Sequence, residues 1–209
     1  MFAPRIPTPT LSRLWQMLAH TSGGILNSAR LAGSLGISSP AVDRYIDLLT
    51  DLGMLRLLRP WSTNVAKRVV KRPKVFVRDT GMLHALLGIS TLHELRGHPV
   101  IGASFESLVI ESVNTALSTN PSAPSWEFYF YRTSNGAEID LVLAKGGKPT
   151  IAIEIKNSSA PQLTRGFHSA VADLGIKQSY LVYPGSERYT IEKNIDVIPL
   201  IDLQNILHS

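Results

Sequence analysis

Residues 136 to 159, GAEIDLVLAKGGKPTIAIEIKNSS, contain two apolar stretches separated by a glycine-rich turn. Every second position in both stretches is a large aliphatic residue: Ile139, Leu141, Leu143, Ile151, Ile153 and Ile155. This alternation is typical of a β-strand with one face against a core. The segment therefore predicts a β-hairpin, and its second face has to accommodate charged side chains, whose burial is unfavourable unless they are paired.

The charged residues expected on this second face are Glu138, Asp140, Glu154 and Lys156. A hairpin centred on Gly147 pairs position 140 with 154 and position 138 with 156. In that register the β-carbons of Asp140 and Glu154 lie about 4.5–5.5 Å apart. Two opposed carboxylates repel each other, and a divalent cation between them turns this repulsion into binding. Oxygen-only ligands favour Mg²⁺ or Mn²⁺ over Zn²⁺.

The segment GASFESLVIESVNTAL, residues 102–117, predicts a helix that contributes a further carboxylate. On a helical wheel Glu106 falls inside the apolar arc, whereas Glu111 falls outside it. A carboxylate on a core-facing stripe needs an ion pair, a backbone cap or a metal. A purely structural alternative remains for the hairpin too, because Glu138 and Lys156 can form a cross-strand ion pair while the other two carboxylates join hydrogen-bond networks.

The N-terminal part of the chain predicts a helical module. Apolar periodicity and capping residues predict helices over residues 10–20, 28–35 and 39–52, followed by a β-prone segment that begins at Met54. The buried stripe of the third helix is expected to consist of Val42, Tyr45, Ile46, Leu49 and Leu52. Helix, short glycine turn, helix and strand together resemble a winged helix-turn-helix.

The basic residues are concentrated in one segment. Residues 52–78 contain no acid and eight of the chain's basic residues: Arg56, Arg59, Lys67, Arg68, Lys71, Arg72, Lys74 and Arg78. This density favours a polyanionic partner such as DNA, although a solvated basic ribbon is the alternative. The segment corresponds to the wing, and the nucleic-acid-binding candidates are Lys67, Arg68, Lys71 and Arg72. The preceding helix is a poorer candidate because Asp43 and Asp47 repel phosphate.

Asp140, followed after 14 positions by Glu154-x-Lys156 and preceded by a helix with Glu106, resembles the PD-(D/E)XK nuclease core. Ile139 stands where that motif has proline. The ordered motifs KVFVRDTGML, GASFESLVIESV, YRTSNGAEIDLVL and IEIKNS are together similar to a nuclease-like C-terminal domain of unknown function. That domain follows an AAA+-type ATPase module in many bacterial and archaeal proteins, with a winged helix between the two.

The resemblance implies an α/β fold in two domains. Residues 1–78 would form a winged helix-turn-helix with a basic wing, and residues 79–209 a PD-(D/E)XK restriction-endonuclease-like mixed sheet flanked by helices. The implied activity is Mg²⁺- or Mn²⁺-dependent cleavage of DNA phosphodiesters. The alternative is a non-catalytic module of the ATPase that binds nucleic acid or protein and regulates it.

Site roles also follow from the resemblance. Asp140, Glu154 and Glu106 would ligate the metal, and Lys156 would orient the attacking water or stabilise the transition state. A lysine base would need a lowered pKa, so this role is preferred. Glu138 and Gln162 are weaker candidates for the same site.

Several classes of function and location are disfavoured by what the sequence lacks. The chain has no cysteine, which rules out disulfides and thiolate chemistry. It has no GxxxxGK[ST] loop, so we expect no ATP site within it. The chain is then either a fragment of a longer ATPase, which we favour, or a natural stand-alone form. The N-terminus has no signal-peptide pattern, and no apolar stretch is long enough to span a membrane. We therefore expect a cytoplasmic protein.

Overall fold

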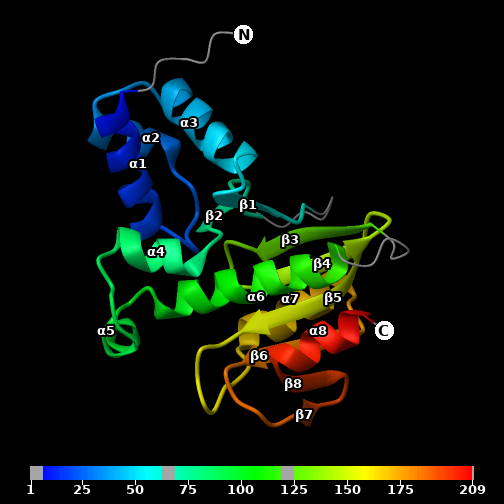
Figure 1. Ribbon diagram of the computed structural model, residues 1–209. Helices are drawn as coiled ribbons and strands as arrows, with labels where there is room; N and C mark the ends of the chain where they lie inside the picture. The colour runs from blue at the N-terminus through cyan, green and yellow to red at the C-terminus, as the bar shows by residue number, and fades with distance from the viewer. Residues whose placement is uncertain (1–6, 63–68, 119–124, 209) are drawn as a thin grey trace. The chain divides into compact units, whose positions relative to one another are not determined.

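The computed structural model describes residues 7–62, 69–118 and 125–208 and has a mixed α/β architecture (Figure 1). The helices are α1 Thr8–His20, α2 Ser28–Leu35, α3 Ser39–Asp51, α4 Thr80–Leu86, α5 Leu92–Gly97, α6 Ile101–Ser118, α7 Arg165–Leu174 and α8 Leu200–His208. The strands are β1 Leu55–Pro60, β2 Lys74–Val77, β3 Trp126–Arg132, β4 Glu138–Lys145, β5 Lys148–Ile155, β6 Gln178–Tyr183, β7 Tyr189–Glu192 and β8 Ile195–Pro199.

The chain divides into two compact units. Unit 1 comprises residues 1–57 and 72–104, and unit 2 comprises residues 58–71 and 105–209. Residues 79–104, which the sequence-based division assigned to the second domain, therefore have their contacts mainly in unit 1. That division stays a prediction, because compactness alone does not identify an independently folding domain.

In unit 1, helix ends coincide with local capping signals. The Asn27 side chain accepts a hydrogen bond from the backbone N–H of Arg30, and Gly36 ends α2 in the left-handed conformation. Asp79 caps α4 by accepting from the N–H of Met82 at 2.6 Å. These helices pack their apolar faces into one core of unit 1.

Two details of the helix predictions were wrong. The first helix begins at Thr8, not at a Thr10 cap, and its first turn contains Pro9, a position to which proline is well suited. Leu52 does not belong to the buried stripe of α3 and is 61% exposed. The helix ends at Asp51 and the chain turns at Gly53 in a left-handed conformation, which takes Leu52 out of the helical period.

The strands form one mixed eight-stranded sheet in the order β2-β1-β3-β4-β5-β6-β8-β7. Strand β4 is antiparallel to both β3 and β5. Strand β6 is parallel to both β5 and β8. Strand β1 runs from unit 1 into unit 2, where Arg59 and Pro60 pair in parallel with β3. The predicted α/β class with a mixed sheet flanked by helices is confirmed.

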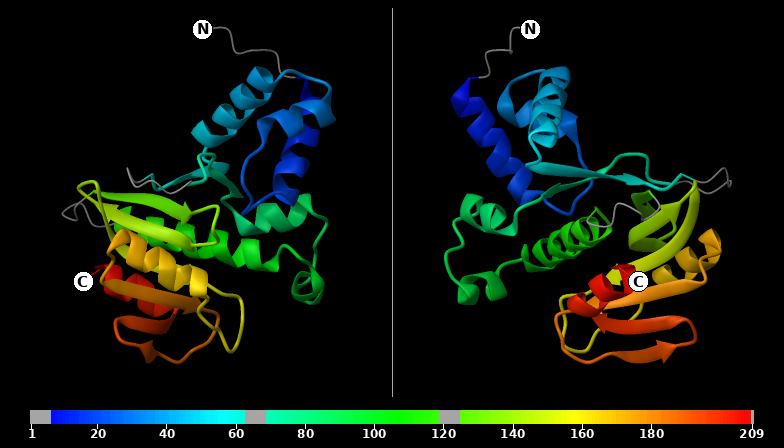
Figure 2. Two further views of the ribbon diagram at one scale, coloured as in Figure 1. Left: turned by 180° about the vertical axis from the view of Figure 1, so that it is seen from behind. Right: turned by 45° about the vertical axis from the view of Figure 1, so that its right-hand side comes forward.

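Unit 2 has helices on both faces of its sheet. Figures 1 and 2 show α7 on one face and α6 and α8 on the other. On the α7 face, Phe167 and Ala170 pack in one cluster with Val142 and Ala152 of the central strands. This arrangement covers both faces of β4 and β5, as expected for an α/β domain.

The predicted hairpin and its register are present. Gly146 and Gly147, with φ of 57° and 71°, form the two-residue turn between Lys145 and Lys148. A register shift next to Ala144 then brings Leu141 opposite Ile153, which is the predicted register. Asp140 and Glu154 are the residues next to this pair on the two strands.

The alternation predicted for the first strand was wrong at one point. Tyr129 pairs with Val142, and Tyr131 pairs with Ile139. An advance of two residues along β3 therefore corresponds to three residues along β4. Strand β4 therefore contains a bulge that includes Asp140. Ile139 lies in the same cluster as Val142, and not on the face shared by Leu141 and Leu143.

None of the helices in the described ranges combines the length and the apolar character that a membrane span requires.

Candidate functional site

Glu154, near the end of β5, is a buried carboxylate with only 4% of its surface exposed. Its Oε1 lies 2.6 Å from Nζ of Lys156, two positions further along the chain. Its Oε2 is also buried and accepts no hydrogen bond from any described residue. Leaving such an acceptor unsatisfied costs about 1–3 kcal/mol. The strand thus holds one carboxylate oxygen at a lysine and leaves the other without a donor from the described part of the chain.

Asp140 lies beside this carboxylate and is fixed by the backbone of β5. Its Oδ2 accepts a hydrogen bond from the N–H of Ile155 at 3.0 Å, and the side chain is half-buried. Because Ile155 follows Glu154 directly, this bond ties the bulge of β4 to the strand that carries the buried carboxylate. β-Bulges re-aim side chains near functional sites in this way.

The electrostatics of the site follow from these contacts. Burial, followed by the negative charge of Asp140, raises the pKa of Glu154 to about 7, against the opposing effect of Lys156. Burial lowers the pKa of Lys156, but the hydrogen bond and charge of Glu154 outweigh it, and the net pKa is raised. Lys156 therefore stays a cation at neutral pH, which is unsuited to a general base.

Glu138 has a different surrounding from the one predicted. It pairs across the sheet with Arg132, with 3.6 Å between the guanidinium Nε and the carboxylate Oε2. Since Ile139 points to the α7 face, Glu138 points to the opposite face, whereas Glu154 shares the α7 face with Ala152. The alternation predicted for this strand was therefore wrong at Glu138, because the bulge resets it. The negative charge of Glu138 still acts on Glu154 and Lys156 and raises the pKa of both, so its part in the site stays a prediction.

Glu106 lies half-buried on α6, on the sheet face opposite α7. Across residues 7–62, 69–118 and 125–208, no three side chains of Asp, Glu, His or Cys are grouped so that they could hold a metal ion. The structure thus brings together Asp140, Glu154 and Lys156. The predicted participation of Glu106 as a third ligand stays a prediction.

The participation of the remaining candidates stays a prediction. Gln162 is exposed in the segment before α7, whose cap is Thr164. Lys67 and Arg68 fall outside the described residues, and Lys71 and Arg72 are exposed.

A contact between the basic segment and the sheet was not predicted. The N–H of Val70 donates to the carbonyl of Arg132, and Val69 forms a bridge with Thr133. The segment that leads to Lys71 therefore runs along the end of β3, within unit 2.

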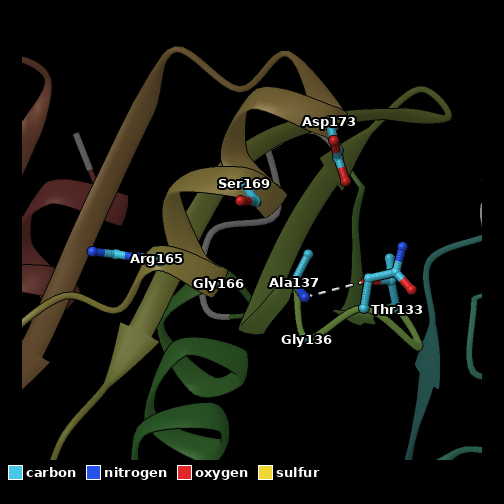
Figure 3. A pocket seen from close by; sticks show the side chains of 8 residues that line it. Thr133, Gly136, Ala137, Arg165, Gly166, Ser169 and Asp173 are labelled. Carbon is cyan, nitrogen blue, oxygen red and sulfur yellow. Dashed lines mark hydrogen bonds between the residues drawn. The ribbon is translucent and has the colours of Figure 1, made fainter.

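Sequence reasoning also missed a pocket of about 430 Å³ in unit 2, shown in Figure 3. It lies between α7 and the turn that joins β3 to β4, and its lining consists of Thr133, Asn135, Gly136, Ala137, Arg165, Gly166, Ser169 and Asp173. A methyl group on Gly166 would overlap the carbonyl oxygen of Gly136. The two glycines are the only sequence signal for this close approach, and neither identifies its partner.

In comparisons with known proteins, two parts of the chain match two different families. Residues 1–93 match the family described as Domain of unknown function (DUF8612), and residues 101–203 match Domain of unknown function (DUF4143). The uncharacterized proteins Rv2008c of Mycobacterium tuberculosis and Mb2031c of Mycobacterium bovis are each 40% identical over 195 residues. The matched region is 93% of this chain but 43% of each relative. The chain is thus similar, along nearly its whole length, to less than half of these longer proteins.

Proposed function

We propose that unit 2 is a divalent-metal-dependent phosphodiesterase that acts on nucleic acid, built on a PD-(D/E)XK-type fold. The observation that carries this proposal is the buried Oε2 of Glu154, which has no hydrogen-bond donor among the described residues and lies next to a second carboxylate. A cation is the partner that satisfies such an oxygen and removes the repulsion from Asp140.

The donor set suits Mg²⁺ or Mn²⁺. Mg²⁺ is usually held by one or two carboxylates, with water and substrate phosphate completing its shell. Asp140 and Glu154 would supply the two carboxylates, and no third protein ligand is then required. When bound, the cation polarises the phosphoryl oxygen and lowers the pKa of the attacking water.

The protein's own groups then have defined tasks. Water adds to phosphorus, one P–O ester bond breaks, and the leaving oxygen takes a proton, which gives a phosphomonoester and a hydroxyl. The ammonium of Lys156, held by Glu154, stabilises the negative charge that develops on the phosphoryl oxygens. Asp140 keeps its orientation through the N–H of Ile155.

The position of the basic segment supports a nucleic-acid substrate. Val69 and Val70 attach this segment to the end of β3, and β4, with Asp140, begins after the next turn. Cations beside a carboxylate site offset the repulsion between that site and a polyanion. A DNA substrate would also place the activity in the cytoplasm.

The test combines metal binding with strand cleavage. We expect Mn²⁺, titrated calorimetrically, to bind the wild-type chain and Glu127→Gln, an exposed control at the other end of β3, but not Asp140→Asn. Nicking of supercoiled plasmid should follow the same pattern and require Mg²⁺ or Mn²⁺. Equal metal binding and equal nicking by Asp140→Asn would rule out the proposed centre.

A non-catalytic function is the second candidate, and the exposure of Lys71 and Arg72 favours it, because exposed cations can hold a polyanion without a metal. In this case the chain would bind nucleic acid or protein as a module of a longer ATPase, with unit 1 as a winged helix. Salt-sensitive retention on DNA that falls in Lys71→Ala and Arg72→Ala, without metal-dependent nicking, would support this function.

A further inference from the structure

The pocket beside α7 has a preformed shape. Gly136, with φ of 85°, and Gly166 bring the turn and the start of the helix into contact at one end. The turn is braced because Thr133 Oγ1 accepts a hydrogen bond from the N–H of Ala137 at 3.2 Å, drawn in Figure 3. A cleft between a capped helix and a braced turn needs little ordering when a ligand enters, which favours affinity.

The interior of the cleft presents hydrogen-bond acceptors. Asp173 is half-buried and accepts from the hydroxyl of Tyr131, with 3.2 Å between the oxygens, so its carboxylate is oriented. Figure 3 shows Asp173 pointing from α7 toward the strands, while Arg165 points away from the turn residues. The cleft therefore favours a ligand whose N–H or O–H donors enter it, with negative charge remaining at the outer rim near Arg165.

The cleft is close to the carboxylate pair along the chain. Ala137 lines it and is three residues before Asp140, a separation of about 10 Å in an extended strand. Its volume of about 430 Å³ lies in the range of small-ligand sites and suits one nucleotide unit. Arg165 and Asp173 are eight residues apart on one helix, about 12 Å along its axis. A nucleotide can extend its phosphate toward one and its base toward the other.

We propose that this cleft is a nucleotide-binding subsite, which holds the sugar and base of a nucleotide next to the phosphodiester at Asp140 and Glu154. Asp173 accepts from the base, as carboxylates do from exocyclic amino groups. Arg165 contacts the adjoining phosphate from the rim. This inference rests on the proposed function, because that function puts a polynucleotide strand at the start of β4.

Filling the cleft tests the subsite directly. Ser169 is exposed on α7 and lines the cleft, whereas Ala172 is exposed on the same helix and does not. Binding of a short fluorescein-labelled single-stranded oligodeoxynucleotide is measured by anisotropy in Ca²⁺ buffer, with an oligoribonucleotide of the same sequence as a second probe. We expect Ser169→Trp to weaken binding by about tenfold, or 1.4 kcal/mol. The matched control Ala172→Trp should stay within about twofold.

A second pair of variants separates recognition from structure. Asp173→Asn should weaken binding by about fivefold and change the preference among homopolymer oligonucleotides, because the amide also donates hydrogen bonds. Tyr131→Phe removes the orienting hydroxyl but keeps the carboxylate, so it should have a smaller effect. Unchanged binding by both Ser169→Trp and Asp173→Asn would overturn the subsite, as would a wild-type chain that binds neither probe.

Failure of the subsite differs from failure of the proposed function. Loss of oligonucleotide binding in Ser169→Trp, with no plasmid nicking by any variant, supports the subsite and refutes the nuclease. Metal-dependent nicking that disappears in Asp140→Asn, with equal oligonucleotide binding by Ser169→Trp and wild type, refutes the subsite alone.

Discussion

The helix caps of unit 1 and the candidate site of unit 2 are specified over different distances in the sequence. In unit 1, Asn27 caps a helix by accepting from a residue three positions away, and Asp79 does the same. In unit 2, Asp140 accepts from Ile155 fifteen positions away, and Tyr131 donates to Asp173 forty-two positions away. Local signals thus fix helices one at a time, whereas the candidate site exists only after the sheet has paired.

The two units should also respond differently to the loss of one side chain. Leu14 in α1 is fully buried in the apolar core of unit 1. We expect Leu14→Ala to lower the free energy of unfolding of unit 1 by about 3–4 kcal/mol, through lost burial and a residual cavity. Denaturant unfolding followed by hydrogen exchange of α1–α3 measures it. A loss under about 1 kcal/mol would contradict the core assignment.

In unit 2 the corresponding substitution removes the cation that pairs with a buried carboxylate. Lys156→Met leaves the Glu154 carboxylate buried without its cation and should destabilise the metal-free chain by about 2 kcal/mol near pH 8, since Lys156 is one-third exposed. Adding Glu154→Gln should restore most of the loss, which denaturant titration of a double-mutant cycle detects. Additive losses in the double variant would show that the pair is not coupled.

Loss of a helix cap in unit 1 should have a smaller effect on stability. Asp79→Ala removes the acceptor for the N–H of Met82 and should cost about 1 kcal/mol of the stability of α4. Asp79→Asn, which can still accept, should lose clearly less. Hydrogen exchange at Met82 reports the effect, and equal protection in wild type and Asp79→Ala would exclude a capping role.

The smallest effect is expected at the edge of the sheet in unit 2. Bonds from Thr190 and Arg188 hold the pKa of Asp196 below its ordinary value of 3.8. A lowered carboxyl pKa stabilises the folded state above the ordinary pKa, and this contribution is lost as the pH falls through the folded pKa. Asp196→Asn should therefore cost about 0.5 kcal/mol at pH 7 and nothing near pH 2. A cost that persists at low pH would point to packing instead.

Much of the fold was predictable because its signals are local. Apolar periodicity, caps and glycine turns placed most helices and the β4–β5 hairpin, and the alternating residues gave the pairing of Leu141 with Ile153. Strand β7 and helix α5 were not predicted. Strand β7 is exposed throughout, so it shows no alternation of burial that a sequence pattern could reflect.

The sequence by itself determined which chemistry is available: carboxylates and a lysine at hairpin spacing, a basic segment, and no cysteine. Only the tertiary structure decided how these groups combine. The register of β4 sets Glu138 beside Arg132 and ties Asp140 to β5, while Gly166 meets Gly136 to form the cleft. The physical reason is that strand registers and helix–turn contacts depend on long-range packing, whereas caps and alternation depend on neighbours a few residues away.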